Sequence, residues 1–201
     1  MTETRALFST LLYRAAIDGI DNAALLQSCR AIAADDGAGR KWSAEHDYKG
    51  YTSYASLNDL PQRDPSFAAL KAALDKHAAA LAKALHFDLA GRKLKLDSIW
   101  INVLEPGGVH TGHIHPHAVL SGTYYVNVPA GASALKLEDP RLAMMMAAPP
   151  KREDAPEAAR PFAYIAPRAG EVVMWESFVR HEVPMNGAKE ARVSVSFNYR
   201  W

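Results

Sequence analysis

The chain has 201 residues, and its 23 basic and 22 acidic side chains leave a formal net charge of only +1. This length predicts a single domain over residues 1–201 with a substantial buried core, and the balanced charge argues against a nucleic-acid partner. No apolar run approaches membrane-spanning length, no signal peptide is visible, and the single cysteine, Cys29, excludes an intrachain disulfide, so we expect a cytoplasmic protein without a membrane partner.

The first part of the chain, about residues 1–90, is expected to supply helices that flank a β-rich core. Residues 1–19 predict a first strand or extended segment. Asp21 precedes an apolar pattern that continues through Ile32, and an aspartate at this position is a good N-cap. We therefore expect a helix from this point to about Gly37.

Two more segments complete this part of the chain. Residues 40–63 are aromatic and polar without a sustained period, which predicts a long loop with a short strand. Asp64-Pro-Ser66 then begins the clearest helix, because apolar residues recur three and four positions apart from Phe67 to Leu85. We expect the helices to pack across one sheet of the core.

From residue 94 to the C-terminus, short β-rich runs alternate with glycine and proline. The runs predict strands over residues 94–104, 119–128, 134–138, 164–166, 171–175, 181–183 and 191–199. Short strands at this spacing indicate an antiparallel sandwich or barrel and not a parallel sheet. The irregular segment 142–163 is too long for a plain hairpin, and we expect it to be a lid-like loop.

Four of the eight histidines lie between positions 110 and 117. In an extended chain, residues i and i+2 lie on one face, so His113 and His115 can direct their imidazoles at one centre. Imidazole is a common ligand of iron, zinc, copper and nickel. His181 follows a later strand-like segment and is the candidate third ligand, while His110 and His117 are alternatives to the first two.

Arg192 begins a strand-like segment in which polar and apolar residues alternate, so that it shares a face with Ser194. A guanidinium that points inward is costly unless it meets an anion, and its planar fork fits a carboxylate. The alternative is that this face simply meets solvent. Together with the histidines, Arg192 predicts a metal centre that also binds an anionic small molecule.

These motifs, taken in order, resemble the 2-oxoglutarate- and iron(II)-dependent dioxygenases. The resemblance rests on His-x-His-Pro at 113–116, Ser-Gly-x-Tyr-Tyr at 121–125, Gly-Glu-Val-Val-Met-Trp at 170–175 and Arg-x-Ser at 192–194. It is strongest to a subgroup similar to prolyl hydroxylases. It implies Fe(II), 2-oxoglutarate as co-substrate, and a mostly β fold, a double-stranded β-helix or jelly roll over about residues 94–201.

The resemblance also assigns roles to individual residues. It places the iron ligands at His113, His115 and His181, and the co-substrate contacts at Arg192, Ser194, Tyr125 and Asn102, with Asn198 as a further candidate. The wider superfamily uses two histidines and one carboxylate. Here His115 stands at the carboxylate position, which implies a three-histidine site and a more positive metal.

The implied activity is oxidative decarboxylation of 2-oxoglutarate to succinate, coupled to oxidation of a small-molecule or peptide substrate, most often hydroxylation. Two alternatives remain. One is a cupin-like three-histidine metal enzyme without 2-oxoglutarate, in which Arg192 would bind the substrate's own carboxylate. The other is a non-catalytic module whose histidines hold a structural metal or none.

Overall fold

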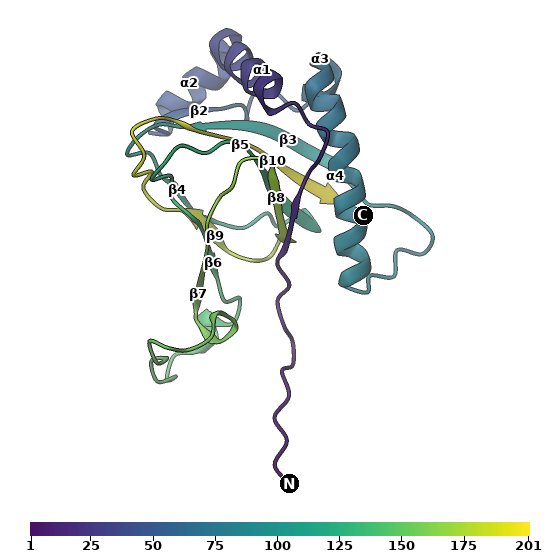
Figure 1. The fold of residues 1–201 in the computed structure, drawn as a ribbon, viewed down its shortest axis with the longest axis vertical. Coiled ribbons are helices and arrows are strands. Elements are labelled where there is room, and N and C mark those ends of the chain that lie inside the picture. Colours follow the sequence, from purple (N-terminus) through teal and green to yellow (C-terminus); the bar gives the residue numbers. More distant parts are fainter.

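The computed structural model describes residues 1–201 as two antiparallel sheets with helices on one side (Figure 1). The larger sheet has the strand order β1–β8–β5–β10–β3–β2, and the smaller has the order β4–β9–β6–β7. The strands are β1 (Tyr13–Ala16), β2 (Gly50–Thr52), β3 (Lys95–Leu104), β4 (His110–His113), β5 (Leu120–Asn127), β6 (Leu135–Glu138), β7 (Phe162–Ile165), β8 (Glu171–Glu176), β9 (His181–Val183) and β10 (Arg192–Arg200). This arrangement is the predicted jelly roll.

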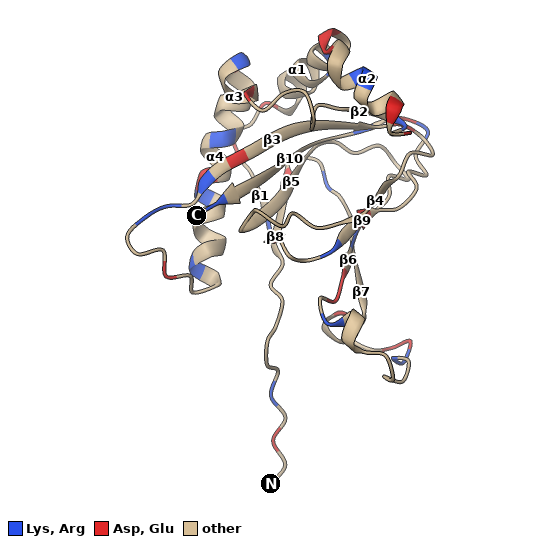
Figure 2. Ribbon diagram, turned by 180° about the vertical axis from the view of Figure 1, so that it is seen from behind, with Lys and Arg blue, Asp and Glu red and all other residues tan.

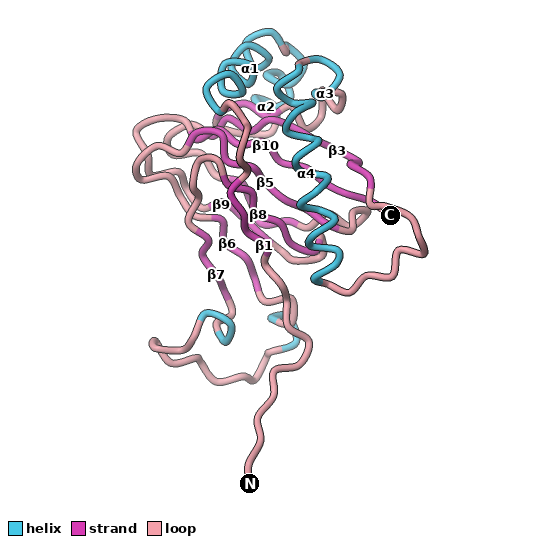
Figure 3. Tube along the Cα trace, turned by 45° about the vertical axis from the view of Figure 1, so that its right-hand side comes forward, coloured by secondary structure: helices cyan, strands magenta, loops and turns pink.

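The helices are α1 (Asn22–Asp35), α2 (Gly37–Glu45), α3 (Leu60–Arg63) and α4 (Pro65–Ala84). They cover the outer face of the six-stranded sheet, and the four-stranded sheet lies on its other side (Figure 3). Charged residues gather on the helices and on the loop from β6 to β7, whereas the middle of the large sheet is nearly uncharged (Figure 2).

The central strand β10 shows how the sequence pattern produces these two faces. Val193, Val195 and Phe197 are buried in the main core under the helices. The alternate residues Arg192 and Ser194 therefore point between the two sheets, where they line a cavity. The polar side of this strand faces the interior of the jelly roll and not solvent.

Helix α4 confirms the clearest helical prediction. Asp64 accepts a hydrogen bond from the Ser66 backbone N–H at 2.7 Å, and Pro65 occupies the first turn, where its missing N–H has no consequence. Such a cap stabilises a helix by about 1 kcal/mol. The apolar stripe is buried against the sheet, with contributions from Phe67, Leu70, Leu74, Ala78 and Leu81.

Residues 40–63 contain more structure than the sequence predicts. Asp36 ends α1 and at the same time caps α2, because its carboxylate accepts from the Gly39 N–H at 2.9 Å. Gly39 permits a close approach: a Cβ there would lie 2.3 Å from an Asp36 oxygen and 2.8 Å from the Tyr51 ring. A second helix, α2, therefore begins at Gly37, and the segment also contains the short helix α3, neither of which was expected. The predicted short strand is β2.

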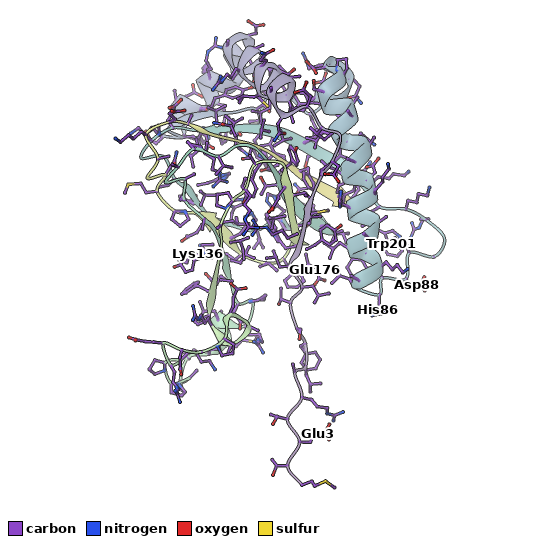
Figure 4. The ribbon with its side chains drawn as sticks, in the orientation of Figure 1. Glu3, His86, Asp88, Lys136, Glu176 and Trp201 are labelled. Atoms are coloured by element: carbon purple, nitrogen blue, oxygen red, sulfur yellow. The ribbon has the colours of Figure 1, made fainter.

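The two strands predicted in the N-terminal part, β1 and β2, form the two edges of the six-stranded sheet. The first residues extend away from the fold, as the position of Glu3 shows (Figure 4), whereas Arg5–Leu12 border a pocket beside β6 and β7. At the other end, Trp201 lies beside the turn that follows α4, where its ring packs 4.2 Å from the Arg92 guanidinium. None of the helices is long and apolar enough to cross a membrane.

The segment 142–163 leaves the end of the four-stranded sheet and projects away from the helical layer (Figures 1 and 3). It contains two short 3-10 turns, Leu142–Met144 and Glu157–Ala159. None of its residues lines the cavity that contains the histidines. In this conformation the loop does not cover the site.

Candidate metal centre

Three of the predicted ligands converge between the sheets. One ring nitrogen from each of His113, His115 and His181 lies within 4.8 Å of the others. His113 ends β4 and pairs directly with His181, the first residue of β9. The register shifts between His110 and His113, as in a β-bulge, and this shift places His113 opposite His181.

His115 reaches the cluster by a different route from the one that the sequence suggests. It lies in the turn after β4 and not on an extended strand, so the two-residue spacing alone does not aim it. Its backbone N–H donates to the Ser177 carbonyl at 3.1 Å, which ties this turn to the end of β8. Tertiary contact therefore orients the third imidazole.

Backbone carbonyls determine the tautomer of two of the rings. His113 Nδ1 lies 2.7 Å from the Thr111 carbonyl oxygen, and His181 Nδ1 lies 3.0 Å from that of Val179. A carbonyl oxygen can only accept, so each Nδ1 carries the proton and each Nε2 presents a lone pair. Such a hydrogen bond is the usual support of a metal-binding histidine.

The rings are also neutral at pH 7, as metal binding requires. Burial, followed by the neighbouring His113, lowers the pKa of His115 to about 4 and that of His181 to about 3. Burial likewise lowers the pKa of His113, partly offset by its bond to Thr111.

The two alternative histidines lie outside this cluster. His110 stacks on His113 with ring centroids 4.7 Å apart and lines the same cavity, but it is not among the three converging residues. His117 is exposed. The structure thus brings together His113, His115 and His181.

Arg192 lies deeper in the same cavity and is only 4% exposed. One terminal nitrogen donates to the Ser133 carbonyl at 3.1 Å, and the guanidinium lies 5.2 Å from the centre of the Tyr125 ring. No carboxylate forms an ion pair with it. A buried guanidinium without a counter-ion is costly.

Buried side-chain nitrogen and oxygen atoms without a hydrogen-bond partner occur at only four places in the chain. These are the Nε of Arg192, the hydroxyls of Tyr125 and Ser133, and the indole nitrogen of Trp175. Arg192 and Trp175 line the cavity, and Tyr125 and Ser133 lie against Arg192. An unpartnered buried polar group costs about 1–3 kcal/mol, so a ligand beside Arg192 would relieve this cost. A carboxylate would accept from the guanidinium and both hydroxyls, so these residues fit an anionic co-substrate, just as the imidazoles fit a metal.

The remaining predicted co-substrate residues form a row across three strands. Ser194 pairs with Asn102 on β3 and with Tyr125 on β5. Ser194 and Asn102 line the cavity. The Asn102 amide is already engaged, because its oxygen accepts from Thr52 at 2.9 Å and its nitrogen donates to Ser196 at 3.0 Å.

Sequence reasoning did not identify three aromatic residues that line the cavity, Tyr48, Trp100 and Trp175. The Trp175 ring meets the His181 ring edge-on at a centroid distance of 4.7 Å. The signal in the sequence was the position of Trp175 two residues after Val173 on one strand. Both side chains belong to the same buried cluster, on the side of the large sheet that faces the cavity. Tyr48 has no such signal, since it lies in a loop between α2 and β2.

A jelly roll with three converging imidazoles and a buried arginine beside them defines a metal-dependent enzyme that also binds a small anion. Residues 98–198 match the family model described as "Putative 2OG-Fe(II) oxygenase". This match covers just over half of the 201 residues, and the chain belongs to that family. It is therefore a 2-oxoglutarate- and Fe(II)-dependent oxygenase. A search of curated protein sequences finds no match.

Solved structures share the fold across nearly the whole chain. A prolyl-4-hydroxylase from Pseudomonas putida is 18% identical, with a TM-score of 0.59, and 94% of this chain and 86% of that chain are covered. The carbocyclase SnoK from nogalamycin biosynthesis is 16% identical, with a TM-score of 0.66 and coverage of 95% and 79%. HygX from Streptomyces hygroscopicus, solved with nickel and 2-oxoglutarate, is 13% identical, with a TM-score of 0.57 and coverage of 96% and 82%.

Proposed function

We propose that this oxygenase holds Fe(II) with His113, His115 and His181, binds 2-oxoglutarate through Arg192, and hydroxylates a small-molecule or peptide substrate. The observation that carries the proposal is the juxtaposition of three neutral imidazoles and an unpaired, buried guanidinium in one cavity. The single buried cysteine supports the cytoplasmic location that we also propose.

When bound, the metal and 2-oxoglutarate would supply a reaction with dioxygen, the four-electron oxidant: two electrons come from 2-oxoglutarate, which is decarboxylated to succinate and carbon dioxide, and two from the substrate carbon, with one oxygen atom entering succinate and the other the hydroxylated product. Arg192 would hold the far carboxylate of the co-substrate through its Nε and one terminal nitrogen, as a planar fork can. The hydroxyls of Tyr125 and Ser133 would donate to the same carboxylate, since both lack another partner. Ser194 and Asn102 would complete the polar wall.

The ligand set also affects the co-substrate. Three neutral imidazoles leave the charge of a divalent ion uncompensated, whereas a carboxylate at position 115 would remove one unit. In a cavity screened from water this additional positive charge favours a bound anion. The role proposed for His115 is thus both to ligate the metal and to strengthen co-substrate binding.

The substrate would approach from a cleft of about 440 Å³ that shares His115 and Trp100 with the metal cavity. Tyr54 stands at this cleft and is 56% exposed, and its ring contacts that of Trp100 at a centroid distance of 5.2 Å. An exposed aromatic surface next to the metal ligands can position an apolar part of a substrate. The part of the metal cavity next to Arg192 would then be left for 2-oxoglutarate.

The experiment is an anaerobic titration of 2-oxoglutarate into the Fe(II)-loaded protein, followed by visible absorption. A weak metal-to-ligand charge-transfer band is expected. Iron binding without that band would favour a three-histidine enzyme that does not use 2-oxoglutarate. Absence of iron binding would favour a non-catalytic module and contradict the proposal.

A further inference from the structure

A chain of hydrogen-bonded polar side chains on the inner face of the large sheet ends at His115. Asn198, only 7% exposed, lies at its centre. The Asn198 amide nitrogen donates to Ser98 Oγ at 3.0 Å and lies 3.5 Å from His115 Nδ1. The amide oxygen accepts from Ser121 Oγ at 2.7 Å, and the Ser121 and Ser177 hydroxyls are 2.8 Å apart.

This contact matches only one tautomer of His115. An amide nitrogen is a donor, so at 3.5 Å it can bond to His115 Nδ1 only when that nitrogen is unprotonated and the ring proton lies on Nε2. His113 and His181 have the opposite tautomer, because backbone carbonyls accept from their Nδ1 atoms. A histidine that binds a metal through Nε2 needs its proton on Nδ1 and an acceptor to receive it.

We propose that Asn198 is a positioning residue for His115, and that its amide turns over when metal binds so that Oδ1 accepts the Nδ1 proton. Asn198 would then do for the third imidazole what the Thr111 and Val179 carbonyls do for the other two. The inference rests on the proposed metal site.

The three serines around Asn198 make this reversal possible without the loss of a hydrogen bond. A hydroxyl both donates and accepts. After the turn, Ser98 donates to the amide oxygen, the amide nitrogen donates to Ser121, and Ser121 donates to Ser177. Every side-chain contact of the network remains, with its direction reversed, and a backbone carbonyl or a carboxylate in place of a serine would forbid this.

The test uses the full-length protein with Zn(II), a redox-inactive probe, and NMR of the ¹⁵N-labelled histidine rings. In wild-type protein the His115 proton is expected on Nε2 without metal and on Nδ1 with zinc, whereas His113 and His181 keep Nδ1–H in both states. A His115 proton on the same nitrogen in both states would overturn the reversal.

Variants test the positioning role. Asn198→Ala should weaken zinc binding about 10- to 100-fold, the usual effect of removing the group that supports a ligating histidine, and should abolish the slowly exchanging His115 Nδ1 proton. Asn198→Asp retains an acceptor and should restore both. Asn127→Ala is the matched control, because it removes a half-buried amide that donates to the Ala191 carbonyl at 3.3 Å outside this network, and it should bind zinc like wild type.

Asn198→Ala protein that binds zinc as tightly as wild type and keeps the His115 Nδ1 proton would contradict the proposal. If Asn198→Ala fails to fold, the proposal is tested by the position of the His115 proton in wild-type protein and by the zinc affinity of Asn198→Asp. Failure of the metal site itself is distinguishable, because wild type and His113→Ala would then have the same zinc affinity before any Asn198 variant is measured.

Discussion

His113 and His181 lie directly opposite each other across β4 and β9, with ring centroids 4.3 Å apart. The irregularity in β4 just before His113 determines this pairing. With a regular register, the residue before His113 would face His181, and the imidazole of His113 would point to the other side of the sheet. One additional residue in a short strand therefore brings the metal cluster together.

Each of the three clustered histidines should be required for metal binding. Replacement of His113, His115 or His181 by alanine removes one of three imidazoles and should weaken Fe(II) binding strongly while the protein remains folded. Anaerobic isothermal titration calorimetry measures the effect. His117→Ala is the control because His117 is exposed and outside the cluster. Loss of iron binding in His110→Ala with full binding in His113→Ala would show that the ligand assignment is wrong.

Arg192→Ala should leave Fe(II) binding intact and weaken the binding of 2-oxoglutarate. Removal of one partner from a buried, charge-assisted pair costs about 2–5 kcal/mol, which corresponds to a roughly thirty- to several-thousand-fold rise in Kd. Arg192→Lys should recover only part of this loss, because an ammonium lacks the planar fork. Titration of 2-oxoglutarate into the anaerobic iron-loaded protein measures each affinity.

Arg200→Ala is the control for Arg192, since the Arg200 side chain is 64% exposed and pairs with Asp97 at 3.3 Å. It should bind 2-oxoglutarate like wild type. Equal affinity in wild type and Arg192→Ala would remove the main support for the co-substrate site.

Two adjacent tyrosines on β5 should respond to loss of the hydroxyl in opposite ways. The Tyr125 hydroxyl is buried without a partner, so Tyr125→Phe should raise the free energy of unfolding of the ligand-free protein by about 1 kcal/mol or more. The same change should weaken 2-oxoglutarate binding. A variant with reduced ligand-free stability and unchanged affinity would contradict both expectations.

Tyr124→Phe is the matched comparison. The Tyr124 hydroxyl donates to Asn22 at 2.7 Å on the helical side of the sheet. Its removal should lower the free energy of unfolding by about 1 kcal/mol and leave 2-oxoglutarate affinity unchanged. Urea denaturation measures the free energy of unfolding of each variant, and anaerobic titration measures the affinity of each for 2-oxoglutarate.

Tyr13 and His77 should make stability depend on pH at a place remote from the metal. The Tyr13 hydroxyl and His77 Nδ1 lie 2.7 Å apart, and the hydroxyl can donate to Nδ1 when the ring is neutral. Burial, and to a smaller extent Lys76, lowers the pKa of His77. The unfolded chain therefore binds a proton at higher pH than the folded chain, and this contribution to stability is lost as pH falls below the unfolded value of about 6.5.

Urea denaturation at pH 7.5 and pH 5.5 measures this effect. Wild type should lose up to about 1 kcal/mol more than His77→Gln over this interval, the value of a typical hydrogen bond. His86→Gln is the control, since His86 is exposed at the turn after α4 (Figure 4). The same pH dependence in wild type and His77→Gln would exclude this pair as the cause.

The local pattern of the sequence was sufficient to predict much of this protein. The apolar spacing after Asp64 predicts α4, and the alternation around Arg192 predicts a strand with one polar face. Both follow from periods of 3.6 and 2 residues, which depend on neighbouring positions alone. The order of the histidine and arginine motifs was enough for the resemblance to the oxygenase family, which the family match confirms.

Other features depend on contacts between distant parts of the chain. Asp36 caps a second helix that its neighbours do not predict, because its carboxylate also contacts Tyr51 and Ser56. The sequence likewise predicts a strand for His115, whereas the turn bound to Ser177 aims that ring.

The spacing of the histidines leaves five candidates, and the resemblance to the family favours His113, His115 and His181. The tertiary structure shows that these three converge, and only it places the unpaired Arg192 beside the Tyr125 ring. Local periodicity determines which residues share a face. Which faces meet, and in what register, is decided by pairing between strands that lie far apart in the sequence, since a shift of one residue moves every side chain to the opposite face.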